Sequence, residues 1–172
     1  MANGSKNLCA ATAGLIVGLM TAVSSFSTEI EPAQGSPEFV GFVFCHVASP
    51  DVGKGLLYLF TPPFAQLVDD ALEHSKKIAA ARPDEKPPLG DGIPYQSYPD
   101  GAPVCEVGAV GDAGEKWRVE IHHRFPDNPS ADWTDRLVLA DWHGRLLIDD
   151  ILYGAEWHRS GLRSVAEAVL RQ

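Results

Sequence analysis

The 172-residue chain has little of what would identify an enzyme or a nucleic-acid-binding protein. Its 14 Lys and Arg are outnumbered by 23 Asp and Glu, and the formal charge of -9 is opposite in sign to the basic surface that phosphate binding requires. No heptad run or short repeat is present, which argues against a coiled coil and a solenoid. We therefore expect no nucleic acid partner. The 45% apolar content predicts a packed core in one compact domain.

Motifs for catalysis and metal binding are also missing. The sequence contains no HExxH, CxxC or EF-hand spacing for a metal ion and no GxSxG for a nucleophilic serine. Gly53-Lys54-Gly55 lacks both the spacing of a phosphate-binding loop and the Ser or Thr that follows its lysine. The sequence therefore predicts no metal and no cofactor, and it identifies no reaction.

The N-terminal residues have the pattern of an export signal. Lys6 is the only charge before Glu29, and an apolar run at residues 8–23 is followed by small polar residues. We expect residues 1–27 to be a cleaved signal peptide that directs the protein to the periplasm or out of the cell, with residues 28–36 as a flexible leader. A membrane anchor is one alternative, since about 20 apolar residues span a bilayer, and a buried helix is the other. Membrane contact is expected only if the segment is uncleaved.

The cysteine count favours one disulfide. Cleavage of the signal removes Cys9 and leaves Cys45 and Cys105 in a compartment that permits oxidation. The alternative is two separate buried thiols, because free Cys is among the most buried residue types.

The apolar spacing predicts helices, then strands, then a last helix. Helical spacing runs over residues 37–47, over residues 63–81 with Thr61 as a cap, and after Ser160 as the cap of the final helix. Alternation predicts strands over residues 105–109, 117–125, 137–142 and 145–153, with a tight turn at His143-Gly144. This order predicts an α+β domain over residues 37–172, with helices on one face of an antiparallel sheet of at least four strands.

Four segments carry a family resemblance. The segments 133–139, 146–154 and 161–163, together with the loop 86–92, resemble a family of exported bacterial proteins known only as a domain of unknown function. That family looks similar to cystatin-like or nuclear-transport-factor-2-like domains, which implies helices packed into a curved antiparallel sheet. The wider superfamily includes both isomerases and binding modules, so the resemblance implies a fold and no activity.

Asp149 and Asp150 form an acidic pair inside an otherwise apolar strand. Successive strand side chains point to opposite faces, so a regular strand would not bring both carboxylates to one site. The flanking isoleucines are three residues apart, which indicates a bulge. One Asp is then expected to accept hydrogen bonds from backbone amides, and the other to face water or pair with Arg136 or Arg145. A catalytic base is the alternative.

His123 is the other catalytic candidate. His122 and His123 are adjacent, so they should face opposite sides of the sheet and cannot chelate one ion together. Alternation with Val119 and Ile121 places His123 on the core face. A histidine there is either a hydrogen-bonded structural residue or, together with the acidic pair, the base of a pocket.

The loop at residues 83–103, called loop 83–103 below, is the expected binding element. It contains six prolines and three glycines, and loops of this length without secondary structure often bind partners. Tyr95 and Tyr98 are expected to be accessible apolar anchors with polar tips, and Asp91 and Asp100 to meet a basic partner. A strap that closes one end of the sheet is the alternative role.

These observations favour an exported, non-catalytic domain that binds a partner protein or a small apolar ligand. The first alternative is a small enzyme of the isomerase or hydrolase kind that uses a pocket His and Asp. The second is an immunity-type partner of a secreted toxin, which small size, export and acidity would suit. A titratable pair in a closed pocket would favour the enzyme, whereas a filled core beneath an exposed loop would favour the binding domain.

Overall fold

The computed structural model describes residue 1 and residues 32–47, 55–90, 94–98, 101–154 and 160–172. The chain divides into two units, Met1–Ile30 and Glu31–Gln172, and the second contains every described helix and strand. Apart from Met1, the expected signal peptide lies outside the described residues, as does the first part of the expected leader. Both stay predictions. None of the described helices is long and apolar enough to cross a bilayer.

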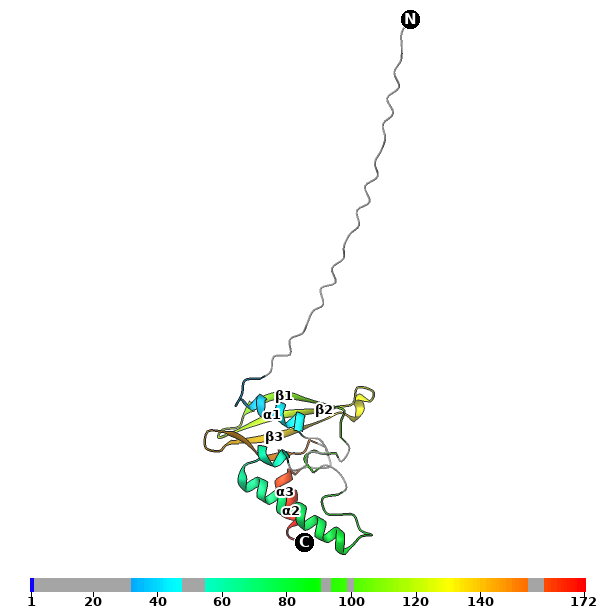
Figure 1. Ribbon diagram of the computed structural model, residues 1–172, viewed down its shortest axis with the longest axis vertical. Helices are drawn as coiled ribbons and strands as arrows, with labels where there is room; N and C mark the ends of the chain where they lie inside the picture. Colours follow the sequence, from blue (N-terminus) through cyan, green and yellow to red (C-terminus); the bar gives the residue numbers. More distant parts are fainter. Residues whose placement is uncertain (2–31, 48–54, 91–93, 99–100, 155–159) are drawn as a thin grey trace. The chain divides into compact units, whose positions relative to one another are not determined.

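The described part of the second unit is an α+β domain built around an antiparallel sheet (Figure 1). The strands follow the chain in the order β1-β2-β3-β4, so each pairs with its sequence neighbour. The predicted fold class is confirmed. The elements are α1 (Pro37–Val47), η2 (Gly55–Leu59), α2 (Pro62–Ala81), β1 (Val104–Asp112), β2 (Lys116–Arg124), η3 (Pro129–Ala131), β3 (Trp133–Asp141), β4 (Leu146–Leu152) and α3 (Leu162–Val169).

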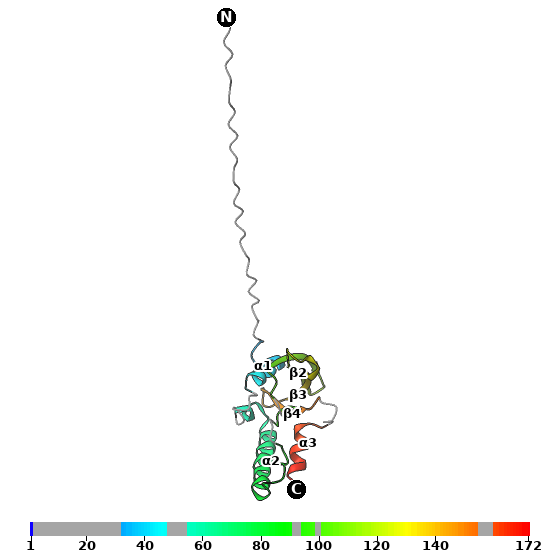
Figure 2. The same ribbon diagram turned by 90° about the vertical axis from the view of Figure 1, so that its right-hand side faces the viewer.

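One face of the sheet is filled by the main hydrophobic core. Alternate side chains of β2 and β3 point into it, and α1 lies across the same face (Figure 2). Gly41 lets α1 approach closely, because a Cβ there would lie only 3.0 Å from Val119 Cγ1 and 3.1 Å from Val107 Cγ2. The sheet side chains of this core with no exposed surface are Val119, Ile121, Leu137, Leu139, Ile148 and Ile151.

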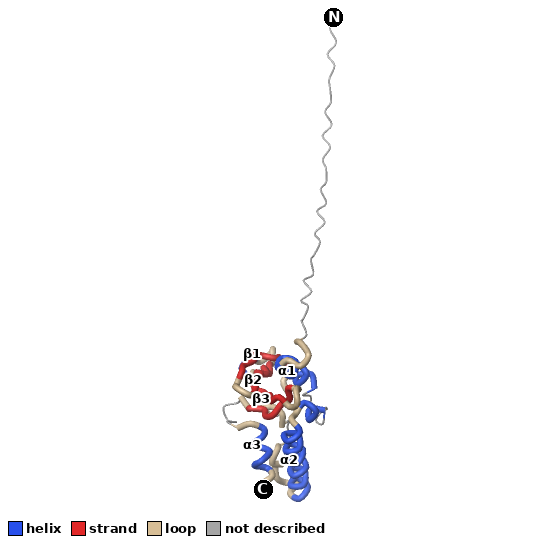
Figure 3. Tube along the Cα trace, turned by 90° about the vertical axis from the view of Figure 1, so that its left-hand side faces the viewer, coloured by secondary structure: helices blue, strands red, loops and turns tan. Residues whose placement is uncertain are grey.

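The helix α2 contributes side chains to two hydrophobic clusters. Its first half carries Phe64 and Val68 into the main core. From its middle onward the helix runs beside α3 (Figure 3), and there Ala71 packs with Ala166 and Val169 in a smaller cluster. A helix of this length extends beyond the sheet because 20 residues span about 30 Å. The result is a pair of helices with one end anchored in the sheet core and the other supported only by neighbouring helix and loop.

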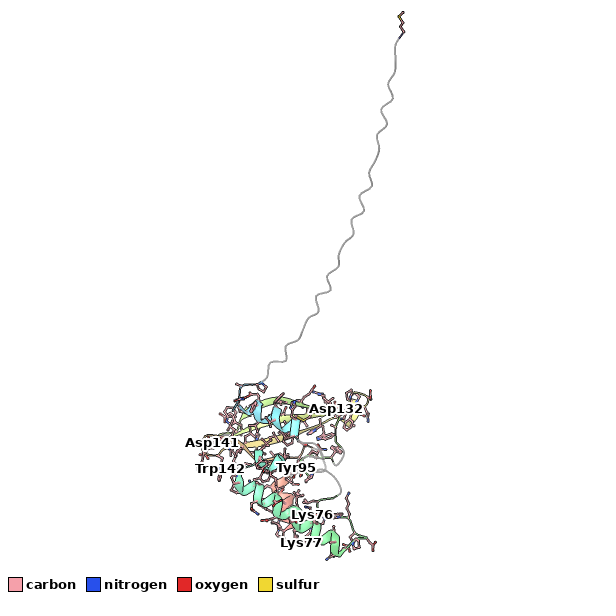
Figure 4. All side chains as sticks on the ribbon, viewed as in Figure 1. Lys76, Lys77, Tyr95, Asp132, Asp141 and Trp142 are labelled. Atoms are coloured by element: carbon pink, nitrogen blue, oxygen red, sulfur yellow. A yellow bond between two sulfur atoms is a disulfide. The ribbon has the colours of Figure 1, made fainter. Side chains whose placement is uncertain are left out.

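The β3–β4 turn forms as predicted. His143 and Gly144 have φ values of 55° and 81°, and the amides of Trp142 and Arg145 donate to each other's carbonyls at 2.8 and 3.2 Å. Two central residues with positive φ define the turn type whose twist matches paired strands. Asp141 Oδ1 accepts the Gly144 amide at 2.8 Å and fixes the tip of the hairpin (Figure 4).

Both edge strands contain a bulge. In β4 the pairing jumps from Val138 opposite Asp150 to Leu139 opposite Ile148, so the predicted bulge at the acidic pair is confirmed. In β1 the register shifts between Val107 and Val110, which was not predicted. Strict alternation over residues 105–109 would place Ala109 on the core face together with Cys105 and Val107. That placement is wrong, because the bulge turns Ala109 to solvent and Val110 takes the position opposite Val119.

Long-range links fasten the helices to the sheet. The predicted Cys45–Cys105 disulfide is present, with Cα atoms 5.4 Å apart, and it joins α1 to β1. At the opposite edge, Phe60 forms a parallel bridge with Ile148 and Gly161 an antiparallel bridge with Leu152. The segments that lead into α2 and α3 therefore continue the sheet beyond β4.

Candidate functional site

Loop 83–103 leaves the C-terminal end of α2 and returns toward the sheet along the helix. Its second turn closes when the Gly90 amide donates to the Pro87 carbonyl at 2.8 Å, and Gly90 has a φ of +71°, a conformation that side chains disfavour. The Leu89 amide then donates to Ser75 Oγ of α2 at 3.3 Å, and Leu89 packs on the smaller cluster. The turn is thus attached to the outer half of α2.

The loop is fixed to the sheet by a buried carboxylate that sequence reasoning missed. Asp135 of β3 is 1% exposed and accepts the Ser97 amide at 2.9 Å and the Ser97 hydroxyl. It also accepts the Gly154 amide at 2.9 Å and the indole N–H of Trp133 at 3.1 Å. The Tyr153 hydroxyl adds a second attachment by donating to the Pro94 carbonyl at 2.6 Å. These contacts hold residues 94–98 against the sheet.

Hydrogen bonding decides the charge of Asp135. Burial raises the pKa of this carboxyl, but the nearby His123 side chain and the hydrogen bonds from Ser97 and the Gly154 amide outweigh burial and hold the pKa below its ordinary value. Asp135 is therefore an acceptor for its neighbours and is not poised to take up a proton near neutral pH.

His123 is a core residue, as its alternation predicts. Its side chain is 4% exposed and its ring stacks on Trp133 with centroids 4.5 Å apart. Nε2 lies 3.4 Å from Asp135 Oδ2 without the geometry of a hydrogen bond. The Ser97 hydroxyl donates to the carboxylate of Asp135 and not to His123. Ser97, His123 and Asp135 therefore lack the serine–imidazole contact that activates a nucleophile.

The predicted tyrosine anchors differ in exposure. Tyr95 is 5% exposed, packs edge-on against Phe60 at 6.0 Å and lies between the sheet and α2 (Figure 4), so the expectation of an accessible ring is wrong there. Tyr98 is half-buried over Trp133, with ring centroids 4.8 Å apart. Asp91 and Asp100 lie outside the described residues. A binding role for these four residues stays a prediction, as does the alternative role of the loop as a strap.

Asp149 joins three elements at the β4 bulge. Its carboxylate accepts Thr61 Oγ1 at 2.9 Å, Lys116 Nζ at 2.8 Å and Arg163 of α3 at 2.9 Å. The expectation that an acidic residue here would pair with Arg136 or Arg145 is therefore wrong, because Asp149 pairs with Lys116 at the start of β2 and with Arg163 in the first turn of α3. Thr61 is the N-cap residue of α2, as predicted, but its hydroxyl is directed to Asp149 and makes no capping hydrogen bond.

Asp150 accepts backbone amides, as expected for one member of the pair. Oδ1 accepts the Ile151 amide at 2.8 Å and the Arg163 amide at 2.9 Å, so Asp150 caps α3. The predicted Ser160 cap is wrong, because α3 begins one residue later after Gly161. Gly161 leaves space for the carboxylate, since a Cβ there would lie 2.6 Å from Asp150 Oδ2. Both carboxylates of the pair are thus occupied by structural contacts.

The two acidic neighbours should show opposite pH dependence. Burial raises the pKa of Asp149, but Lys116, Thr61 and Arg163 outweigh it and leave the pKa below its ordinary value, whereas burial keeps the pKa of Asp150 raised. The Asp149 carboxylate therefore stabilises the fold above about pH 4, and that contribution is lost as pH falls through its lowered pKa. The Asp150 carboxylate costs stability as pH rises through its raised pKa.

Urea unfolding from about pH 3 to about pH 7 tests this. Asp149→Asn should lower the free energy of unfolding by about 1–2 kcal/mol near neutral pH and by less in acid. The cost of Asp150→Asn should change in the opposite direction and be larger in acid. Parallel trends for the two variants would contradict the assigned contacts.

The three catalytic candidates do not share a site. His123 lies opposite Trp133 at one end of the β2–β3 pairing, whereas Asp149 contacts Lys116, which pairs with Ala140 at the other end. Among the described residues, no group of three or more His, Cys, Asp and Glu could hold a metal ion.

A surface pocket lies where loop 83–103 meets the second half of α2. Its volume is about 210 Å³, and its walls are mostly apolar, with the Ser75 hydroxyl and the Lys76 side chain as polar groups. The hydrogen bonds of Leu89 and Pro94 described above fix two of its walls. The lining residues are Leu72, Ser75, Lys76, Ala79, Pro87, Leu89, Gly90 and Pro94.

No protein family model, curated protein sequence or solved structure matches the chain. The functional assignment therefore rests on the geometry of these residues.

Proposed function

We propose that the domain is a non-catalytic binding module that takes an apolar side chain of a partner protein into the pocket between α2 and loop 83–103. The observation that carries the proposal is a pocket of about 210 Å³ with apolar walls. An engineered cavity of about 150 Å³ takes up benzene, whereas sites for small molecules occupy about 300–1,000 Å³. The volume thus suits one aliphatic or aromatic side chain better than a free small ligand.

The attachment of the loop supports binding with little reorganisation. Leu89 is tied to Ser75 of α2, Pro94 is tied to Tyr153, and Ser97 is tied to Asp135. Walls held in this way lose little conformational entropy when a partner arrives, and preorganisation of this kind raises affinity.

The filled sheet favours this function over an isomerase-like or hydrolase-like enzyme. Such an enzyme would need His123 and an acidic partner beside a cavity on the concave face. That face is packed with fully buried aliphatic side chains, and the imidazole stacks inside it. No observation favours the immunity-type alternative specifically.

Export and family membership complete the proposal. The Cys45–Cys105 disulfide supports an oxidising compartment, the periplasm or the exterior, as the place where the protein works. The element order, helices followed by an antiparallel sheet with α1 on one face, supports the resemblance to cystatin-like and nuclear-transport-factor-2-like domains.

Filling the pocket should weaken the binding of an apolar group. We expect N-acetyl-phenylalanine amide to shift the methyl resonances of Leu72 and Leu89 with a dissociation constant of about 1 mM, and N-acetyl-serine amide to leave them unchanged. Ala79→Trp, which places an indole in the pocket, should weaken the binding at least about tenfold.

Ala80→Trp is the matched control because Ala80 is exposed and does not line the pocket. It should bind the phenylalanine probe like the unmodified protein, and thermal melts should show that both variants fold. Equal binding by the two tryptophan variants would place the apolar site elsewhere.

A further inference from the structure

The pocket lies beside several lysines of an acidic protein. The chain has a formal charge of -9, whereas residues 72–90 carry four cations and three carboxylates, a formal charge of +1. The cations are Lys76, Lys77, Arg82 and Lys86, and the carboxylates are Glu73, Asp84 and Glu85. Figure 4 shows Lys76 and Lys77 on this part of α2. The local charge is thus opposite to that of the molecule as a whole, which suits an anionic group at this place.

Two lysines lie at the pocket, and only one of them is paired with a carboxylate. Lys76 lines it, and its Nζ is 2.8 Å from Glu73 Oε1 while 65% of the side chain is exposed. Lys86 lies beside Gly90, another lining residue. A Cβ built on Gly90 would be 3.4 Å from Lys86 Cε and 4.0 Å from Lys86 Nζ. Within the part of the chain that the structure describes, Lys86 forms no ion pair or hydrogen bond. Lys86 is therefore the exposed ammonium at the pocket that the described residues leave unpaired.

The ligand must offer an apolar group and an anion very close together. The pocket has room for one side chain, so the anion has to belong to the same residue as that side chain or to an equally short molecule. A peptide's last residue meets this requirement, because its carboxylate and its side chain share one Cα. A long-chain fatty acid does not, since most of its tail would remain outside a volume of about 210 Å³.

We propose that this pocket recognises the free C-terminus of a partner chain that ends in an apolar residue, with the side chain between α2 and loop 83–103 and the carboxylate at Lys86 and Lys76. The inference rests on the proposed function and specifies the partner's chemistry. Ammonium–carboxylate pairs at exposed positions contribute modestly, so we expect the carboxylate to raise affinity by about fivefold. The apolar contact supplies the rest.

Acetylated pentapeptides test this on the full chain. We expect Ac-Gly-Ser-Gly-Ser-Phe with a free carboxylate to bind about fivefold more tightly than the same peptide with a C-terminal amide, as measured from methyl shifts of Leu72 and Leu89. The difference should become much smaller at about 1 M NaCl, where the Debye length is only about 3 Å and exposed charges are strongly screened. It should disappear in Lys86→Gln but persist in Lys77→Gln, the matched control, because Lys77 is exposed on α2 and does not line the pocket.

The outcomes separate the two proposals. Equal binding of acid and amide would overturn carboxylate recognition and leave the apolar pocket standing. Equal loss of the preference in the Lys86 and Lys77 variants would overturn the local contact in favour of general charge. Failure of both peptides to bind would overturn the proposed function itself. Tighter binding of dodecanoate than of the acid peptide would identify a free amphiphile as the ligand and overturn the peptide terminus.

Discussion

Replacing Asp135 with Ala should lower the free energy of unfolding by about 3–5 kcal/mol. The variant leaves the amide and hydroxyl of Ser97, the Gly154 amide and the Trp133 indole N–H without the acceptor that all of them share. Each buried donor that loses its partner costs about 1–3 kcal/mol, and the costs do not simply add because the groups form one network. Residues 94–98 should also detach from the sheet before the rest of the domain unfolds.

Denaturant unfolding and amide hydrogen exchange measure the two parts of this prediction. Exchange of the Ser97 amide should become much faster in Asp135→Ala, whereas amides of α1 should change only with global stability. Asp127→Ala is the control, because Asp127 is exposed, and it should change stability by no more than about 0.5 kcal/mol. A loss below about 1 kcal/mol in Asp135→Ala would show that the donors find other partners.

Removing the disulfide should cost about 4 kcal/mol. Cys45 and Cys105 are 60 residues apart, so the bridge restricts the unfolded chain across a segment that includes η2, α2 and loop 83–103. Closing a loop of this length lowers the entropy of the unfolded state by that amount in the chain-entropy model. Since small domains are typically stable by about 5–15 kcal/mol, the double variant Cys45→Ser with Cys105→Ser should lose a large part of its stability.

A reductant provides the internal control. Dithiothreitol should destabilise the unmodified protein to the level of the double serine variant and leave that variant unchanged. Cys9→Ser should behave like the unmodified protein. A reductant effect that persists in the double variant would mean that the thiols are not paired as described.

Local patterns were enough to predict most of the backbone. The His143-Gly144 hairpin followed from one dipeptide because the requirement for positive φ concerns only the turn itself. The bulge at Asp149-Asp150 followed from the spacing of two isoleucines. Strand alternation also placed His123 in the core. Each of these features depends on residues only a few positions apart.

The incorrect and incomplete assignments involve partners far along the chain. Thr61 and Ser160 are good caps by residue type, but Thr61 bonds to Asp149, 88 residues away, and the cap of α3 comes from β4. Asp135 could have been found, because it alternates with buried residues of β3, yet its acceptor role depends on Ser97, 38 residues earlier. Composition alone does not say which positions of a proline-rich loop turn inward, and so Tyr95 was misplaced.

The candidate site was predicted only as a region. The length and proline content of loop 83–103 indicated a binding element. The pocket itself needs the second half of α2 as its other wall, and nothing in the sequence aligns Leu72 and Ala79 with Leu89. The alignment arises from the Leu89–Ser75 hydrogen bond, which forms after the chain has reversed direction.

The two edges of the sheet differ in how open they are to pairing with a strand from another chain. Phe60 and Gly161 already pair with this strand, whereas no described segment forms backbone hydrogen bonds along the outer edge of β1. An incoming extended polypeptide can therefore be added next to β1 only, and there the bulge between Val107 and Val110 interrupts the regular row of donors and acceptors. Edge-to-edge association of sheets is thereby disfavoured on both sides, because β4 is partly covered and the β1 edge is irregular.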